Sequence, residues 1–365
     1  MKKKRAVAVT ATFLILIFAL AALFLLPDAK LSCSERRKLT QIPEFSADAI
    51  ISGEYAQDFE SYLLDQFPFR DRFRTVKSVL SFYIFGQADN NEVYIFGDGA
   101  FKMDYPLDEK QIDYAAAKLN SLNEALLKNS RVYYSIIPDK NYFAAEDTGH
   151  PHIDYDKLVL LLSEQLSGME YINIFPYLSI EDYYRTDAHW KQESIYPVAQ
   201  ALAAAMDASD RLSPLSSYAE ETLYPFYGVY YGQSALPLKP DTIRYLTNSL
   251  TESALVTGPE FTDTRAVYNT QAFSGMDGYD VFLSGAQAVV EISCPQAESD
   301  RELIIFRDSF ASGIAPYFIG AYSKITLVDL RYISSSVLQN YIDFHGQDVL
   351  FLYSTSLLNS AMLLK

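Results

Sequence analysis

The sequence predicts an α/β fold with a parallel sheet flanked by helices, preceded by a single apolar helix. Three observations carry this prediction. The last 65 residues alternate aliphatic runs with helical stretches in the order β-α-β-α-β, which is typical of parallel strands. Apolar residues make up 49% of the 365, enough to bury a substantial core. Residues 6–26 form an uncharged run near the amino terminus.

That run of 21 residues is long enough to span a bilayer. Four basic residues precede it, which predicts a single-pass membrane protein with its amino terminus inside and the rest outside. A cleaved signal peptide is the alternative. A lipoprotein signal fits less well, because Lys30 stands before Cys33 where an aliphatic residue is expected. We divide the chain into an anchor (1–27), a juxtamembrane stalk (28–50) and an ectodomain (51–365).

Charge and composition limit the partners. The net charge of −16 repels phosphate backbones, so we expect no nucleic-acid binding. The 28 tyrosines either stack on sugars at the surface or fill strand positions. Cys33 and Cys294 either pair outside the cytoplasm or remain free thiols. His150-Pro151-His152 with Asp154 is either a metal site or a proline-interrupted loop; we favour the loop and expect no metal and no cofactor.

Apolar periodicity defines the elements between the stalk and residue 206. A helix over residues 54–82 breaks at Pro68, and a strand at 93–96 ends in a glycine-rich turn. Asp108 caps the next helix, which runs to residue 128. A strand at 132–137 and helices at 156–166 and 195–206 follow.

The periodicity fades over residues 207–300, which we interpret as an irregular excursion rather than a separate domain. Short strands are expected there at 281–283 and 288–292. Regular structure returns with strands at 303–306, 325–330 and 349–353, separated by helices at about 310–322 and 334–344.

Two separate segments offer the parts of a hydrolytic site. Ser309 follows a predicted strand and begins a helix, so its hydroxyl and its N–H lie where parallel sheets bind ligands. Asp187 and His189 can lie on one side of an extended or turn segment, where the carboxylate orients the imidazole. The alternatives are helix capping by Asp308 and Ser309, and packing of His189 with Trp190 ahead of a helix.

Several short segments follow one another in a distinctive order along the ectodomain. They are residues 35–39 (ERRKL), 59–62 (FESY), 65–71 (DQFPFRD), 93–99 (VYIFGDG), 137–140 (IPDK), 185–190 (RTDAHW), 307–310 (RDSF) and 328–332 (VDLRY). Their order and spacing resemble the DHHW family of extracytoplasmic bacterial proteins. That family is similar to the alginate O-acetyltransferase group, which has an SGNH-hydrolase-like fold.

The resemblance implies roles for individual residues. Ser309 would be the nucleophile, His189 the base and Asp187 the orienting acid. SGNH enzymes complete the oxyanion hole with a glycine N–H and an asparagine. Gly285 is the matching glycine, but no asparagine accompanies it.

The resemblance leaves other positions in the site less defined. Ala188 stands where the family motif has a histidine, which removes one donor from the pocket. Arg307 and Trp190 are candidate substrate contacts. Lys140 either lines the same pocket or is a solvated surface lysine.

The resemblance therefore implies an O-acetyltransferase or acetylesterase acting on a cell-surface polysaccharide. Its acyl donor would arrive through a membrane-bound O-acyltransferase. The alternative is a catalytically inactive glycan-binding or assembly protein of the envelope, which the absent asparagine and the unusual Arg307 favour. A purely structural envelope protein has only the anchor and the charge in its favour.

Overall fold

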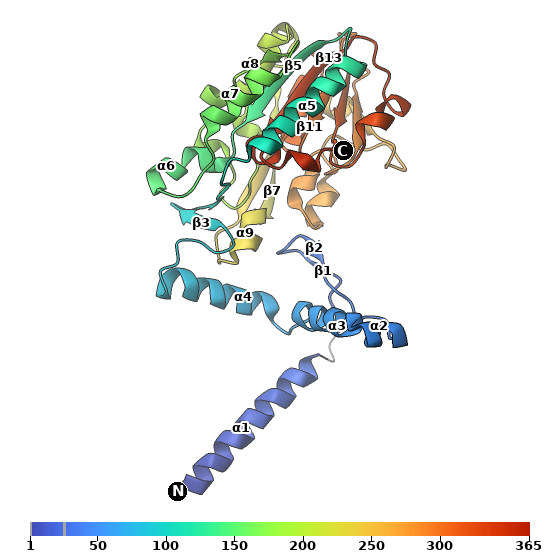
Figure 1. The fold of residues 1–365 in the computed structure, drawn as a ribbon. Helices are drawn as coiled ribbons and strands as arrows, with labels where there is room; N and C mark the ends of the chain where they lie inside the picture. The colour runs from blue at the N-terminus through green and yellow to red at the C-terminus, as the bar shows by residue number, and fades with distance from the viewer. Residues whose placement is uncertain (1, 25–26) are drawn as a thin grey trace.

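A seven-stranded sheet between two layers of helices forms the body of the molecule (Figure 1). The computed structural model describes residues 2–24 and 27–365. The strand order is β6-β5-β13-β11-β12-β10-β9. The strands are β5 (Arg131–Ile137), β6 (Glu170–Tyr171), β9 (Leu255–Thr257), β10 (Val289–Ser293), β11 (Glu302–Arg307), β12 (Lys324–Val328) and β13 (Asp348–Ser354).

Five neighbouring strands, from β6 to β12, run parallel, which confirms the predicted fold class and the parallel order of the last three strands. Two antiparallel strands, β10 and β9, complete one edge. The register pairs Arg307 with Leu352 and Ser354 with Ile137. The carboxyl ends of β11, β13 and β5 therefore lie together at one edge of the sheet.

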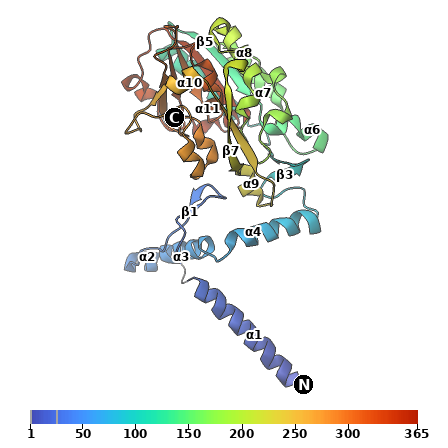
Figure 2. The same cartoon turned by 180° about the vertical axis from the view of Figure 1, so that it is seen from behind.

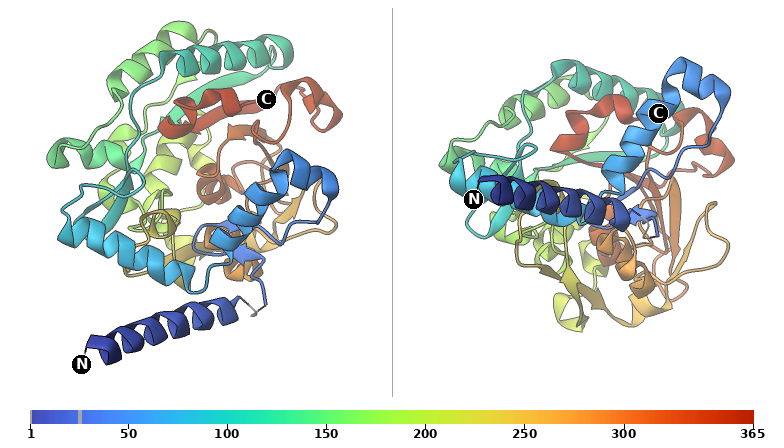
Figure 3. Two further views of the ribbon diagram at one scale, coloured as in Figure 1. Left: turned by 60° about the horizontal axis from the view of Figure 1, so that its bottom comes forward. Right: turned by 90° about the horizontal axis from the view of Figure 1, so that it is seen from below.

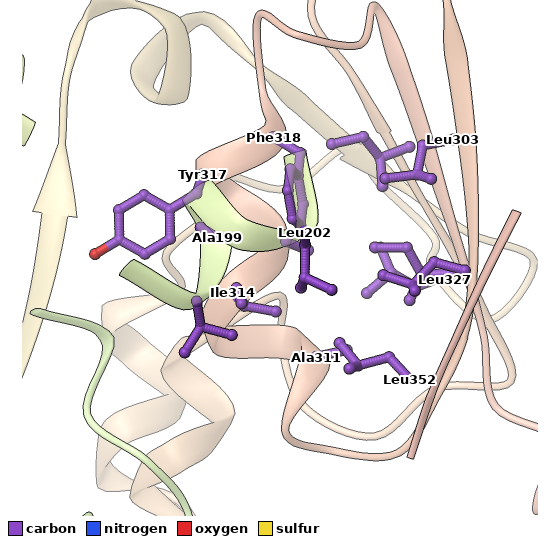
Figure 4. Close-up of a cluster of buried hydrophobic side chains, with 14 of the residues drawn as sticks. Ala199, Leu202, Leu303, Ala311, Ile314, Tyr317, Phe318, Leu327 and Leu352 are labelled. Carbon is purple, nitrogen blue, oxygen red and sulfur yellow. The ribbon is translucent and has the colours of Figure 1, made fainter. Parts of the chain in front are cut away.

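Side chains of the central strands alternate between two apolar cores. On one face Ile304 and Phe306 pack under α5 (Glu109–Leu126) and α7 (Tyr155–Gln165). On the other face Leu303 and Leu352 meet α8 (Tyr196–Ala205) and α11 (Ala311–Ile314), as Figure 4 shows. Both faces are buried, which explains why the strands are continuous aliphatic runs.

Three predicted elements differ in the structure. The helix expected over 310–322 stops at Ile314 and continues as the 3-10 helix η10 (Ala315–Phe318), because Pro316 has no N–H to donate. The helix expected over 334–344 is the 3-10 helix η11 (Ser335–Asn340). The strand expected at 281–283 is wrong: η9 (Gly278–Val281) occupies part of it, and Phe282 packs in an aromatic cluster.

The irregular segment 207–300 lies beside the sheet and joins it through β9 and β10 (Figure 2). Its β7 (Ala219–Phe226) and β8 (Asp241–Thr247) form a separate antiparallel pair. Between and after them lie α9 (Val229–Ser234) and α10 (Ser249–Ser253). Short helices elsewhere are α6 (Ala145–Thr148), α12 (Thr355–Leu358), η2 (Lys140–Phe143), η3 (Phe175–Tyr177), η4 (Ile180–Asp182), η5 (Gln192–Ser194), η6 (Ser209–Arg211), η7 (Leu215–Ser217), η8 (Thr270–Ser274) and η12 (Ala361–Leu363).

The amino-terminal helix α1 (Lys2–Leu23) projects away from the body. Its residues Lys4–Leu23 have a mean hydropathy of 2.6 and are long and apolar enough to cross a membrane. The predicted run ends with Leu25 and Leu26, which lie outside the described residues.

A small subassembly lies between α1 and the body (Figure 3). It consists of the hairpin β1 (Leu31–Ser32) and β2 (Arg37–Lys38), followed by α2 (Ala47–Ser52), α3 (Glu54–Asp65), α4 (Arg70–Val79) and the π-helical turn η1 (Leu80–Ile84). The hairpin β3 (Val93–Phe96) and β4 (Gly99–Lys102) then leads into the body, with its turn where the glycines predict it.

The segment expected to be a stalk is packed rather than extended. Arg37 donates two hydrogen bonds to Asp65 on α3, at 2.8 and 2.5 Å, and Glu35 accepts from Arg70 on α4 at 2.6 Å. On its other side the hairpin lies against α9, where a Cβ on Gly232 would stand 1.5 Å from the Ser34 carbonyl oxygen. Cys33 is exposed and Cys294 is buried, and both are free thiols.

Candidate active site

Ser309, His189 and Asp187 meet at the carboxyl edge of the sheet. The Ser309 Oγ lies 2.7 Å from His189 Nε2, and His189 Nδ1 lies 2.5 Å from Asp187 Oδ1. Asp187 is fully buried and its carboxylate accepts hydrogen bonds, so Nδ1 carries the proton and Nε2 accepts from the serine hydroxyl. This is the geometry that general-base activation of a serine requires.

Asp308 holds Ser309 at the end of β11. One carboxylate oxygen accepts from the Phe310 N–H at 3.0 Å, and the other accepts from the Ser354 N–H of β13 at 2.8 Å. Asp308 therefore does the capping, which leaves the Ser309 hydroxyl for His189. Ser309 is partly exposed although its neighbours are buried, and its N–H has no acceptor among the described residues.

A tight antiparallel loop presents Asp187 and His189. Tyr183 pairs with Trp190, and the Tyr184 N–H donates to the His189 carbonyl at 3.1 Å. Asp187 lies at the tip, where its Oδ1 also accepts the His189 N–H at 3.0 Å. The spacing of two residues therefore places both side chains on one side, because the chain turns between them.

Asp241, at the start of β8, fixes this loop from one side. Its carboxylate accepts from the N–H groups of Arg185 and Thr186 at 3.1 and 2.8 Å, and from the Thr186 hydroxyl at 2.6 Å. The loop is thus held by a buried charge in a segment that the sequence marked only as irregular.

Lys140 fixes the loop from the other side, and both positions expected for it are wrong. Its side chain neither faces solvent nor lines an open pocket, since the residue is only 2% exposed. Nζ donates to the carbonyls of Ala100, Tyr184 and Arg185 at 2.6 to 2.8 Å. Burial lowers the pKa of Lys140 to about 7, yet three acceptors match the three donors of the ammonium form.

Arg36, from the turn of the β1–β2 hairpin, completes the surroundings of Asp187. Its Nη2 lies 3.0 Å from Asp187 Oδ2, which also accepts the Val229 N–H of α9 at 2.7 Å. Burial opposes ionisation of Asp187, but Arg36 and then His189 outweigh it and hold the pKa of the carboxyl well below its usual range. Asp187 is therefore a carboxylate with every oxygen paired.

Two further residues border the imidazole. Tyr279 stacks on His189 with ring centroids 3.9 Å apart and an angle of 8° between the rings. Asp277 pairs with the second arm of Arg36 at 2.6 Å. Burial, and then repulsion from Asp187, raise the pKa of Asp277, so Arg36 separates two carboxyl groups that would otherwise repel each other.

Arg307 and Trp190 do not face the site opening. Arg307 is fully buried, donates to the Asp308 carbonyl and to Ser312, and leaves Nε and Nη2 unpaired among the described residues. Trp190 is also fully buried and donates its indole N–H to the Phe310 carbonyl at 3.0 Å. Both positions correct the expectation of a substrate contact and give these residues packing roles around Ser309.

Gly285 is not available as an oxyanion donor. Its N–H donates to the Phe282 carbonyl at 3.2 Å, and with φ of +85° it packs against the Asp280 carboxyl. Ala188, which stands where the family motif has a histidine, packs against Val93 and Tyr230. The structure thus offers the Ser309 N–H as the oxyanion donor.

The histidine pair outside the site is accounted for by packing. His150 stacks on Tyr94 at 3.8 Å and His152 lies parallel to Tyr155. Over residues 2–24 and 27–365, no group of three or more His, Cys, Asp or Glu side chains is arranged to hold a metal ion.

Sequence reasoning missed Arg36, Asp241 and Tyr279. Arg36 belongs to one of the segments that carry the family resemblance, which was the only signal available for it. Asp241 and Tyr279 lie in the irregular excursion, where no periodicity points to a site. Each acts through a contact with a residue at least 55 positions away.

Similar solved structures support the fold. A DHHW family protein from Eubacterium siraeum superposes with a TM-score of 0.61 at 22% identity, over 76% of this chain and 97% of that one. Bacillus cereus PatB1 gives 0.58 at 17% identity, over 73% and 96%. The O-acetyltransferase domain of Pseudomonas putida AlgJ is more distant, with 0.44 at 13% identity over 73% and 92%. Curated protein sequences offer no significant match.

The sheet, the flanking helices and the position of Ser309 after a parallel strand agree with the SGNH-hydrolase-like fold that the resemblance implies. The DHHW family model matches residues 86–328, from the first hairpin of the body to the end of β12. That span is more than half of the chain and contains Asp187, His189 and Ser309. The chain therefore belongs to the DHHW protein family.

Proposed function

We propose that this chain is a membrane-anchored, extracytoplasmic O-acetyltransferase or acetylesterase that acts on a cell-surface polysaccharide. The observation that carries the proposal is the pair of short contacts of His189, 2.5 Å to Asp187 and 2.7 Å to Ser309. A buried, ion-paired aspartate is one that stays charged while the imidazole gains and loses a proton.

The first half-reaction loads the serine. Ser309 Oγ attacks the carbonyl carbon of an acetyl ester while its proton passes to His189 Nε2, and the carbonyl electrons move onto oxygen. The Ser309 N–H, which has no acceptor among the described residues, would donate to that developing charge. Collapse of the adduct breaks the bond to the donor alcohol, which leaves with the proton from Nε2.

The second half-reaction empties the serine. A sugar hydroxyl or a water molecule gives its proton to His189 Nε2 and attacks the acetyl carbon of acetyl-Ser309. The bond to Oγ then breaks and Oγ regains the proton. Attack by a sugar makes the chain a transferase and attack by water makes it an esterase.

The family resemblance supplies the proposed partner and location. The basic residues in the first turns of α1 favour a cytoplasmic amino terminus and an exported ectodomain. The acetyl donor would then come from a membrane-bound O-acyltransferase beside the anchor. Protease added to intact cells should digest the ectodomain, and full protection in sealed cells would contradict this topology.

One observation favours the second candidate, a glycan-binding protein without catalysis. The Gly285 N–H is already engaged, so the oxyanion would find one backbone donor where SGNH enzymes use more. Loss of one such donor typically lowers the rate by a factor of about 100 to 1000. A slow enzyme and a binding protein must therefore be separated by covalent labelling.

The test is labelling of the purified full chain with a serine-reactive sulfonyl fluoride or fluorophosphonate. PatB1 has been solved with a sulfonyl adduct, which makes the first reagent suitable. We expect modification at Ser309, little modification of His189→Ala, and none at that position in Ser309→Ala. Hydrolysis of a chromogenic acetyl ester and of an acetylated glycan should follow the same order.

Ser309→Ala combined with His189→Ala should be little worse than either change alone, because the residues act as a unit. If wild type is unlabelled and no faster than Ser309→Ala on both substrates, with circular dichroism unchanged, the glycan-binding protein replaces the enzyme.

A further inference from the structure

Helix α4 packs with its polar face on the β1–β2 hairpin and on α9 of the body. Arg70 and Arg74 bond to Glu35, and Arg74 also donates to the Gly232 carbonyl at 2.7 Å. Ser78 is buried and its hydroxyl donates to the Ser234 carbonyl at 2.5 Å. A surface helix ordinarily turns its apolar stripe to the core. Helix α4 has the opposite orientation, because its polar face makes these contacts.

The apolar stripe of α4 and η1 therefore faces away from the body. With 3.6 residues per turn, Phe69, Phe73, Val76 and Leu80 share the face opposite Ser78. The side chains are exposed, with 55% at Val76, 42% at Leu80 and 71% at Tyr83. The members of this outer stripe are Phe69, Phe73, Val76, Leu80, Tyr83, Ile84 and Phe85.

The outer stripe is continuous with the end of α1. The ring of Phe24, one residue past the helix, contacts Phe67 edge-on at 6.1 Å, and Phe67 contacts Phe73 of the stripe at 5.6 Å. Viewed from below, α1 and α4 lie on the same side of the body (Figure 3). The stripe thus begins at the level where a membrane-spanning α1 would leave the bilayer.

Charge on α4 also fits a membrane surface. The chain carries −16 overall, yet α4 has three arginines and one lysine against a single aspartate. Arg70 and Arg74 face inward, while Arg72 and Lys77 are exposed on either side of the stripe, with Arg72 over the Phe69 ring. Basic residues beside an apolar stripe are typical of helices that lie in a headgroup layer.

From the inverted packing, the continuity with α1 and the local positive charge, we infer that α4 and η1 lie in the membrane interface, with the outer stripe among the acyl chains and Arg72 and Lys77 at anionic headgroups. The occupant of this surface is lipid. The inference rests on the proposed anchoring. It goes beyond the reaction because it sets the distance between Ser309 and the bilayer surface.

The experiment places a fluorescent probe on the stripe of the full chain in nanodiscs. Cys33→Ser and Cys294→Ser first remove the native thiols. Val76→Cys then carries an environment-sensitive dye, and Leu160→Cys on α7 is the matched control, because the two native side chains are 55% and 54% exposed. The quencher is a phosphatidylcholine with a nitroxide on its upper acyl chain.

We expect quenching at position 76 at least about twofold stronger than at 160, as for side chains buried just below the headgroups. Phosphatidylglycerol in the nanodisc should increase the quenching at position 76. Lys77→Gln should reduce this increase, because it removes a positive charge beside the stripe. Tyr83→Cys provides a second position on the stripe. A probe at Ile15→Cys reports insertion of α1 separately, so failure of the anchor is distinguishable. Quenching of the probe at position 15 without quenching at positions 76 and 83 overturns the inference. A response of the dye at position 76 that appears only after another protein is added overturns it as well, because the occupant of the stripe would then be a protein.

Discussion

Arg36 Nη2 lies 3.0 Å from Asp187 Oδ2, although the two residues are 151 positions apart. The arginine comes from a hairpin that precedes the α/β body, outside the span matched by the family model. Asp187 is therefore held between the α/β body and the β1–β2 hairpin. A site made only of the body would leave a fully buried carboxylate facing Asp277 without a cation.

Arg36→Gln should move the acid limb of the activity profile to higher pH. The guanidinium is the strongest influence that lowers the pKa of Asp187 against burial, so its loss raises that pKa. The carboxylate that orients His189 is then protonated at a higher pH than in wild type. We expect kcat/KM to fall about tenfold or more near neutral pH, and further below it, as measured by pH-rate profiles.

The control for this variant is Lys38→Gln in the same hairpin, since Lys38 is exposed. Arg36→Lys keeps one cation and should fall between Arg36→Gln and wild type. If Arg36→Gln lowers the rate by one factor at every pH, the arginine holds the hairpin in place and does not act through Asp187.

Gly228→Ala should displace the loop that carries Asp187. The backbone of Gly228 has φ of −75°, which alanine accepts, but its Cβ would lie 2.2 Å from the Thr186 carbonyl oxygen and 2.5 Å from Asp187 Cα. We expect the free energy of unfolding to fall by about 1–3 kcal/mol, as for other overpacked sites. Activity and Ser309 labelling should fall together, because both depend on His189 and the loop that carries this base moves.

Gly149→Ala is the comparison for that variant, because no atom lies within 4 Å of its Cβ. Because residue 149 has a positive φ, alanine there should destabilise the fold slightly. The folded Gly149→Ala variant should have normal activity. Equal losses of activity in the two variants would show that Gly228 affects only stability.

The central strands of the sheet could be predicted because they are continuous aliphatic runs, and burial on both faces leaves that pattern in the sequence. Ser309 could be predicted for the same reason, since it lies two residues after the end of β11. The apolar pattern of residues 310–322 predicts one long helix. Pro316 has no N–H to donate, so the α-helical hydrogen bonds stop there and a 3-10 helix follows.

The supports of the site could not be predicted. A lysine after a strand normally faces solvent. Lys140 is buried because its ammonium group donates to three carbonyls that come from other segments of the chain. Arg36, Asp241 and Tyr279 reach the loop across long sequence separations, for which one sequence carries no signal. Arg307 looked like a ligand-binding residue and is buried instead, because its side chain turns back under the α11 turn to reach Ser312.

Glu193→Gln should stabilise the protein above pH 7 but not below about pH 4.5. Burial raises the pKa of Glu193 to about 7 from an ordinary 4.5, and its Oε2 has no partner among the described residues. The proton therefore stabilises the folded chain at low pH, and this contribution is lost as pH rises through 7. Chemical denaturation at several pH values measures the free energy of unfolding. Relative to wild type, this free energy should increase by about 1–3 kcal/mol in Glu193→Gln as the pH rises from 4.5 to 7. The exposed Glu164→Gln should show no such change.

Tyr279→Leu should lower kcat with little change in KM, because the ring orients the base and does not reach the substrate. His189 lies between Tyr279 at 3.9 Å and Phe310 at 4.9 Å, so removal of one ring lets the imidazole tilt away from Ser309. Aromatic contacts of this kind contribute about 0.5–1.5 kcal/mol, which corresponds to a rate loss of about 2- to 12-fold. Tyr279→Phe keeps the ring and removes a buried hydroxyl without a partner among the described residues, so it should match wild type in rate and be at least as stable. A rate loss in Tyr279→Phe equal to that in Tyr279→Leu would instead place the hydroxyl, and not the ring, in the reaction.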